Sequence, residues 1–348
     1  MKIILFTLEF GGFGDIIFSF KIYNFLINKG HDVRIMTFWK TIQKFKNLIK
    51  KNIEFIGLNR DVCSFVQYDD LYISQMDKQK VNKYDLIIIA PLNSSGVNTY
   101  EPLHLKIENI FLHEIPLEKI KFITEYNVYD IEDHPNILKT GLPTPYKLDI
   151  EREESILEQD LNLENLGILI TNPEIHTKIL EVYGLKAGEY AFVWISVMEG
   201  VTNCLISFLD MISDKWQNKN KKLKVLVPEY FKNRYIHLVP NSNIELVFIF
   251  PVEYKYIPTL MKYSIPDILV TGDQSVSDVI SCCENKIIWY QIAPWKITFA
   301  EHFFSLLERV PTLSSCGSLE CSKPSKEAIL YIRKNLNFFD FLENVILI

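Results

Sequence analysis

Residues 2–15 have the sequence KIILFTLEFGGFGD, and this stretch decides the fold. Its apolar run, residues 2–8, shows no polar alternation, which is typical of a central parallel strand buried on both faces. Glycines then break the strand, and a helical apolar pattern follows from Ile16 to a plausible end at Lys29-Gly30. The next strand is expected at residues 33–37. Strand, glycine turn, helix and strand together predict a βαβ unit.

The same alternation continues along the chain, interrupted by a polar, acidic stretch at about residues 151–164. Further strands are predicted at residues 53–57, 84–90, 121–125, 190–197, 224–227, 244–250, 268–270 and 286–290. Helices are predicted at residues 205–215, 257–262, 276–283, 300–307 and 325–342. Two consecutive βα series predict two α/β layers rather than one block of strands and one of helices.

A chain of 348 residues is long enough for two cores. We therefore expect an N-terminal domain at residues 1–160, a second domain at residues 161–325, and a C-terminal helix at residues 326–348 that packs back on the first domain. A hydrophobic fraction of 48% and a charged fraction of 23% are those of a globular protein. The net charge of −6 argues against nucleic acid or an anionic membrane as a partner.

The cysteines and the N-terminus predict a soluble, cytoplasmic protein. Six cysteines are scattered without a CxxC pair, and adjacent Cys282 and Cys283 lie in an apolar stretch, so we interpret them as small, buried, reduced residues rather than a zinc site. Cys316 and Cys321 leave a metal or redox pair open as an alternative. Glu9 interrupts the N-terminal apolar run, which argues against a signal peptide. No apolar run has the ~20 residues that cross a bilayer.

The glycine turn Gly11-Gly12-Phe13-Gly14-Asp15 is the first candidate site. Glycines between a strand and a helix let the backbone approach a ligand. The turn is not GxGxxG, and its carboxylate would repel a cofactor phosphate. Asp15 instead suits removal of a proton from an acceptor nucleophile. The alternative is that Asp15 only caps the helix.

The second candidate site is Thr271-Gly272-Asp273-Gln274-Ser275, which follows a predicted strand and precedes a helix. Free amides at a helix N-terminus bind a diphosphate without a metal. The alternative is a plain turn with Ser275 as the helix N-cap. Downstream, the aromatic stretch from Trp289 to Lys296 offers stacking surfaces and a cation, although Trp289 itself is expected in the core.

These residues resemble a known family. Gly12 to Ile16, the helix after it and Gly30-His31-Asp32-Val33 resemble the start of the protein-arginine rhamnosyltransferases that modify a translation elongation factor. Phe250-Pro251, the turn at residues 271–275 and the aromatic stretch are similar to the second half of that family. The Gly-Asp pair also resembles the ADP-heptosyltransferases. The resemblance implies the GT-B fold, in which two Rossmann-like, doubly wound parallel-sheet domains face each other across a cleft.

The resemblance also implies roles for individual residues. Asp15 matches the family's general base, and Asp273 falls where the family has an essential glutamate. Gln274 and Ser275 fall on its phosphate-binding aspartate and serine. Thr271 replaces an arginine, and Val252 replaces a glutamine that contacts the donor base. These departures leave the rhamnosyl donor and the elongation-factor acceptor in doubt.

The function predicted from the sequence is that of an inverting, metal-independent glycosyltransferase with no cofactor, using a nucleotide-diphosphate sugar and a protein or glycan acceptor. The expected catalytic residues are Asp15 and Asp273. The expected donor-binding residues are Gly272, Gln274, Ser275, Phe250, Tyr290, Gln291 and Lys296. The expected acceptor-binding residues are Gly12, Phe13, Gly14 and Glu125. The alternatives are a GT-B binding protein without turnover and a dinucleotide-dependent oxidoreductase, against which the missing GxGxxG argues.

Overall fold

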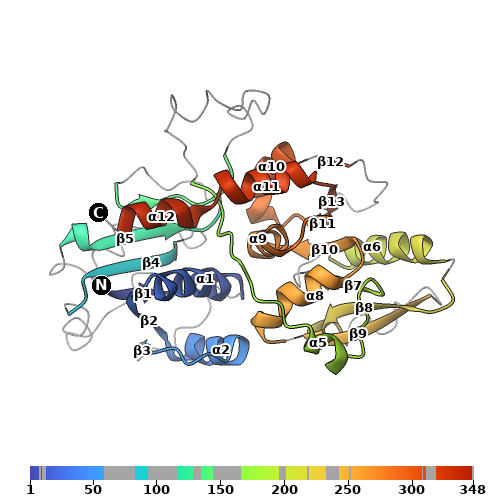
Figure 1. Ribbon diagram of the computed structural model, residues 1–348, viewed down its shortest axis with the longest axis horizontal. Coiled ribbons are helices and arrows are strands. Elements are labelled where there is room, and N and C mark those ends of the chain that lie inside the picture. The colour runs from blue at the N-terminus through green and yellow to red at the C-terminus, as the bar shows by residue number, and fades with distance from the viewer. Residues whose placement is uncertain are drawn as a thin grey trace. The chain divides into compact units, whose positions relative to one another are not determined.

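A computed structural model of the chain forms two compact units, each built on its own sheet (Figure 1). The structure describes residues 1–7, 9, 13–58, 83–92, 116–127, 135–143, 166–195, 201–217, 219–232, 243–250, 252–307, 309–310 and 319–346. Of these, residues 1–143, 166–169 and 337–346 belong to the first unit, and residues 170–336 belong to the second.

The first unit has a six-stranded sheet in the order β3-β2-β1-β4-β5-β6, and every neighbouring pair is parallel. Its strands are β1 (Lys2–Phe6), β2 (Asp32–Phe38), β3 (Phe55–Leu58), β4 (Leu86–Leu92), β5 (Ile120–Thr124) and β6 (Ile137–Leu138). Its helices are α1 (Gly14–Asn28), α2 (Trp39–Ile49), α12 (Phe338–Ile346) and the 3₁₀ turn η2 (Leu117–Lys119). The strand order reverses between β1 and β4, as in doubly wound Rossmann-like sheets.

The central strand β1 is buried on both faces, as its unbroken apolar run predicts. Residues 3–6 are fully buried, and so are Ile88 and Ile89 on the neighbouring β4. Burial of each such side chain stabilises the fold by about 1.5–3 kcal/mol. Helices on the sheet supply the covering layers, because parallel strands need crossover connections.

The second unit has a seven-stranded sheet in the order β12-β13-β11-β10-β7-β8-β9. Its strands are β7 (Tyr190–Trp194), β8 (Leu223–Pro228), β9 (Ile244–Phe250), β10 (Asp267–Thr271), β11 (Ile287–Gln291), β12 (Arg309–Val310) and β13 (Leu319–Ser322). Its helices are α5 (Lys178–Val182), α6 (Val201–Trp216), α8 (Ile257–Tyr263), α9 (Asp273–Cys282), α10 (Ile297–Leu306) and α11 (Lys326–Asn335). Three 3₁₀ turns join them: η4 (Glu229–Phe231), η5 (Tyr254–Tyr256) and η6 (Pro294–Lys296).

Five strands of this sheet, from β9 to β11, are parallel, and the order reverses between β7 and β10. The expectation of a purely parallel sheet is wrong at one edge, where β13 runs antiparallel to β11 and β12 antiparallel to β13. These edge strands are short, and no apolar run marks them in the sequence. Phe208, Leu209 and Ile212 of α6 pack with the sheet into one apolar core.

The end of the chain returns to the first unit. Residues 325–342, predicted as one helix, are two: α11 belongs to the second unit and α12 to the first. The Phe25 ring of α1 stacks on Phe339 with centroids 4.7 Å apart, and the Phe338 N–H donates to the Ile168 carbonyl at 2.9 Å. In Figure 1 the red helix α12 accordingly lies with the blue and cyan elements.

The cysteines only partly match the expectation of reduced thiols. Cys282, Cys283 and Cys321 are free, whereas the fully buried Cys204 is disulfide-bonded. Within the described residues, no helix is both long and apolar enough to cross a membrane.

Candidate functional site

Both predicted turns lie at the switch point of their own sheet. The turn before α1 follows β1, beside the reversal between β1 and β4. The turn at Gly272 follows β10, beside the reversal between β7 and β10. In open α/β sheets, ligands bind outside the carboxyl ends of the strands at such points. Each unit therefore presents its candidate residues where its topology favours a ligand.

In the second unit, the turn opens directly into α9. Gly272 is the N-cap with a φ of +75°, a left-handed conformation that favours glycine, and a Cβ built there would meet nothing within 4 Å. The helix begins at Asp273, three residues before the predicted start, so Gln274 and Ser275 lie in its first turn. The plain-turn alternative required Ser275 to be the N-cap, and it is therefore wrong on this point, because the N-cap is Gly272.

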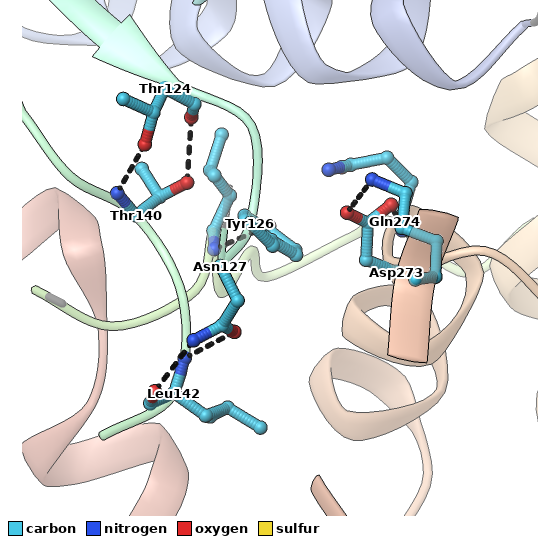
Figure 2. A network of polar contacts seen from close by, with 9 residues as sticks. Thr124, Tyr126, Asn127, Thr140, Leu142, Asp273 and Gln274 are labelled. Carbon is cyan, nitrogen blue, oxygen red and sulfur yellow. Dashed lines mark hydrogen bonds and ion pairs between the residues drawn. The ribbon is translucent and has the colours of Figure 1, made fainter. Parts of the chain in front are cut away.

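A buried ion pair occupies the start of α9. Lys296 Nζ lies 2.8 Å from Asp273 Oδ2, and the two side chains are only 7% and 5% exposed. The other carboxylate oxygen, Oδ1, accepts the Gln274 N–H at 2.9 Å (Figure 2). Lys296 is also the N-cap residue of α10. The pair thus joins the N-termini of two helices, and Lys296 balances the Asp273 charge within the site.

Two polar side chains beside this pair are buried without a partner. Gln274 is 6% exposed, and neither its Oε1 nor its Nε2 has a hydrogen-bond partner within the described part of the chain. Thr298, in the first turn of α10, is 9% exposed, and its hydroxyl likewise has none there. Leaving a buried polar group unsatisfied costs about 1–3 kcal/mol, so such groups are candidates to bind a ligand or an ordered water.

Thr298 was not predicted from the sequence. Its only signal is that the stretch after Trp289 repeats the strand–turn–helix pattern of the Gly272 turn. The register places Thr271 opposite Gln291, and the Thr271 hydroxyl donates to the Gln291 carbonyl at 3.1 Å. The parallel strands β10 and β11 therefore end side by side, and their two turns meet at one edge.

The other expected donor residues lie in different surroundings. Gln291 is buried at the end of β11, at the same edge as Thr271. Tyr290 is fully buried, with its ring 6.1–6.3 Å from the rings of Phe299, Phe303 and Phe304, so its ring belongs to the core under α10. Phe250 ends β9, and its side chain is outside the described part of the structure.

In the first unit, Asp15 is the second residue of α1 and is 7% exposed. The N-cap is Phe13, whose side chain is 37% exposed and makes no capping bond. The alternative that Asp15 is the helix N-cap is therefore wrong, although a carboxylate in the first turn still interacts favourably with the helix dipole. Gly14 opens the helix, and a Cβ there would also meet nothing within 4 Å. Gly12 lies outside the described residues.

Glu125, half-buried, follows β5 directly, and its N–H donates to the Leu92 carbonyl at the end of β4 at 2.8 Å. It therefore lies at the carboxyl edge of the sheet from which α1 also starts.

A hydrogen-bond network fixes the chain beyond Glu125 (Figure 2). The Asn127 side chain bonds both backbone groups of Leu142. Asn127 Nδ2 donates to the Leu142 carbonyl at 2.9 Å, and the Leu142 N–H donates to Asn127 Oδ1 at 3.0 Å. Thr124 and Thr140 exchange two further bonds, at 2.9 and 2.7 Å. The buried Tyr126 hydroxyl accepts the Leu169 N–H at 2.7 Å. These bonds make the end of β5 a rigid support.

No group of three or more His, Cys, Asp or Glu side chains suited to a metal ion occurs among the described residues.

Known structures share this architecture. UGT89C1 of Arabidopsis thaliana complexed with UDP matches with a TM-score of 0.50 and 12% identity, over 99% of this chain and 94% of that one. The glycosyltransferase VinC in complex with DTDP matches with a TM-score of 0.50 and 10% identity, over 99% and 98%. MurG of Acinetobacter baumannii matches with a TM-score of 0.50 and 10% identity, over 100% and 98%.

The chain has the GT-B fold. This fold class, predicted from the sequence, is confirmed by matches that span nearly the whole chain. No family model matches the sequence, and no curated protein matches it. The identities of 10–12% show the fold alone. The resemblance to the protein-arginine rhamnosyltransferases stays a prediction.

Proposed function

We propose that this GT-B chain is a glycosyltransferase that moves a sugar from a nucleotide-diphosphate sugar to a protein or glycan acceptor, with inversion and without a metal. The observation that carries the proposal is the buried Gln274 side-chain amide at the N-terminus of α9, which has no hydrogen-bond partner among the residues that the structure describes. A helix N-terminus attracts anions through its free N–H groups and its dipole. An amide that lacks a protein partner there supplies a further hydrogen bond to a bound diphosphate.

In this proposal Lys296 and Asp273 work together. Lys296 supplies the positive charge that the departing diphosphate needs, as preorganised charges do at leaving groups. Asp273 accepts one of its N–H bonds at 2.8 Å and so holds the ammonium beside the turn. Asp273 is then a positioning residue rather than a proton-transfer group, because both of its oxygens are engaged.

Asp15 is the proposed general base on the first unit. It takes the proton of the acceptor nucleophile while that nucleophile attacks the anomeric carbon. The bond from the anomeric carbon to the diphosphate oxygen breaks, and the electron pair leaves with the diphosphate. Attack from the opposite face inverts the anomeric configuration. Phe13, Gly14 and Glu125 are the proposed acceptor contacts.

A second candidate is a nucleotide-sugar-binding protein without turnover. The engagement of both Asp273 oxygens favours it, because the resemblance implies an essential carboxylate at that position. The two candidates share the donor site and differ only in chemistry.

Saturation-transfer NMR against a panel of nucleotide sugars tests both. We expect binding of at least one donor, slow hydrolysis of that donor, and no effect of EDTA on either. Binding without hydrolysis would favour the second candidate, and binding of NADH in place of nucleotide sugars would overturn both. A strict Mn²⁺ or Mg²⁺ requirement would show that a metal holds the diphosphate.

A matched pair of variants locates the site. Gln274→Met should weaken donor binding, whereas Ser213→Ala should not. The Ser213 hydroxyl is also buried without a partner among the described residues, but it lies near the C-terminal end of α6, away from the switch point. Equal losses in both variants would place the donor elsewhere.

A further inference from the structure

A cavity of about 600 Å³ lies in the second unit at the end of α9 remote from Asp273. Its lining includes Cys282 and Cys283, with Ser264 and Pro266 before β10 and Lys286 before β11. It therefore opens at the amino ends of the strands, the edge opposite to the Gly272 turn. The volume is in the range of small-molecule pockets, about 300–1,000 Å³.

Two free thiols meet in its wall. Cys282 Sγ and Cys283 Sγ lie 3.4 Å apart, within hydrogen-bonding range for sulfur. Cys282 is partly exposed and Cys283 is buried. The hydrogen bond between the two sulfurs, together with Lys286, Arg333 and Lys262, lowers the pKa of Cys283, whereas the same bond, burial and the Asp278 carboxylate raise the pKa of Cys282. The Cys282 thiol also donates to the Pro258 carbonyl at 3.6 Å, so Cys282 is the protonated neighbour and Cys283 the nucleophile.

The charges that line the cavity favour an anion. Its cations are Lys262, Lys286 and Arg333, against the single carboxylate of Glu284. Lys286 is fixed by three acceptors: the Ser264 carbonyl at 2.6 Å, the Ser264 hydroxyl at 3.0 Å and the Ile265 carbonyl at 2.9 Å. Arg333 donates to the carbonyls of Ile280 and Cys283 at 2.6 and 2.9 Å. Lys286 and Arg333 are therefore held in place in the cavity wall, although Arg333 Nη1 also lies 3.7 Å from Glu284 and burial lowers the pKa of Lys286.

We propose that Cys282 and Cys283 form a thiol–disulfide exchange site for an anionic low-molecular-weight disulfide of the glutathione class. The Cys283 thiolate attacks one sulfur of the bound disulfide, whose S–S bond breaks and releases one thiolate, which takes a proton from water. Cys282 then loses its proton to water and attacks the Cys283 sulfur, which releases the second thiolate. Two protein thiols are oxidised to one disulfide, and the bound disulfide is reduced to two thiols.

The product is easily reversed. Adjacent residues have Cα atoms about 3.8 Å apart, below the usual disulfide range of about 4.4–6.8 Å, so the ring is strained. Strained disulfides have more oxidising potentials and are reduced by the small-thiol pool. The site therefore senses the ratio of disulfide to thiol rather than forming a permanent crosslink.

Peptide mapping by mass spectrometry of the full chain tests the proposal with glutathione disulfide as the probe. Wild type should gain one glutathionyl group on Cys283 and then lose two hydrogens across Cys282 and Cys283. Cys282→Ser should trap the mixed disulfide on Cys283, and Cys283→Ser should slow modification about 10-fold. Cys321 is an internal control, because burial raises its pKa to about 12.

Charge and pH sharpen the test. The exchange rate should fall from glutathione disulfide to the neutral bis(2-hydroxyethyl) disulfide and to the cationic cystamine. Lys262→Gln should reduce the ratio of the exchange rates with glutathione disulfide and with cystamine by about twofold to fivefold, because Lys262 is an exposed charge at the cavity. The rate should rise with pH through a midpoint below that of an ordinary thiol, since the thiolate is the nucleophile.

Three outcomes would overturn the proposal: no exchange at either cysteine in folded wild type, faster reaction with cystamine than with glutathione disulfide, or equal reaction of Cys282 in Cys283→Ser. The wild-type map decides the first two even if a variant is unstable in a thermal melt. None of these readouts depends on sugar transfer.

Discussion

The turn before α1 and the turn before α9 occupy the same place in their two sheets, but they treat a carboxylate differently. In the second unit, Asp273 is paired with Lys296 inside the site, and the uncharged Gln274 amide is left for a ligand. In the first unit, Asp15 is the second residue of α1 and is 7% exposed. A neutralised helix N-terminus suits an anionic donor, whereas a carboxylate at the end of a strand suits proton removal. We propose that the same topology supports two chemical roles.

The largest expected effect tests the role of the first turn. Asp15→Asn should lower sugar transfer about 10²–10⁴-fold, because a general base contributes that range. Donor affinity, measured by NMR or calorimetry, should hardly change, since the proposed donor residues belong to the other unit. The melting temperature should fall only slightly, because Asp15 is not the N-cap and a first-turn carboxylate gains about 0.3–1 kcal/mol from the helix dipole. Transfer at the wild-type rate would remove Asp15 from the mechanism.

The next effect tests the ion pair of the second turn. Lys296→Met leaves the buried Asp273 carboxylate without its ion-pair partner Lys296. This loss should lower the free energy of unfolding by about 3–5 kcal/mol. The double variant Lys296→Met/Asp273→Asn should regain most of that stability in denaturant titrations but not the donor affinity.

Its control is Lys221→Met, which removes the more exposed pair with Glu189 and should leave the melting temperature nearly unchanged. A double variant that binds the donor as well as wild type would show that the pair is structural only.

A third prediction concerns the rigid support in the first unit. Asn127→Ala removes both bonds to the Leu142 backbone and should cost about 2–3 kcal/mol, because buried N–H and C=O groups lose their partners. Asn344→Ala, at an exposed site on α12 of the same unit, should change stability by no more than about 0.5 kcal/mol. Equal shifts in melting temperature in the two variants would mean that the network does not contribute to stability.

The smallest effect separates binding from stability at the second turn. Gln274→Met keeps the side-chain volume and removes a buried amide that has no partner among the described residues. Donor affinity should fall about 5–10-fold, the loss of roughly one hydrogen bond, while the melting temperature holds or rises. A lower melting temperature with unchanged affinity would show that Gln274 serves the fold instead.

The alternation of apolar runs with glycine turns was enough to predict the two α/β series, because buried parallel strands and helices leave different periods in the sequence. The prediction of β9 at residues 244–250 was correct at both ends. The start of α9 was placed three residues late, since Asp273, Gln274 and Ser275 are as common in turns as in a first helical turn. The break between α11 and α12 was missed because an apolar pattern continues through it.

The sequence by itself determined the layers and the residue types of the two turns, because these depend on local periodicity and, at Gly272, on glycine's freedom at positive φ. Only the tertiary structure decided which polar groups meet. Lys296 and Asp273 are 23 residues apart and pair because the parallel strands β10 and β11 end side by side. The same long-range packing buries the Gln274 side chain without a partner among the described residues, brings three cations to the cavity that Cys282 and Cys283 line, and places the Tyr290 ring in the core. Strand order and the pairing of polar groups arise from contacts between distant segments, so no local pattern contains them.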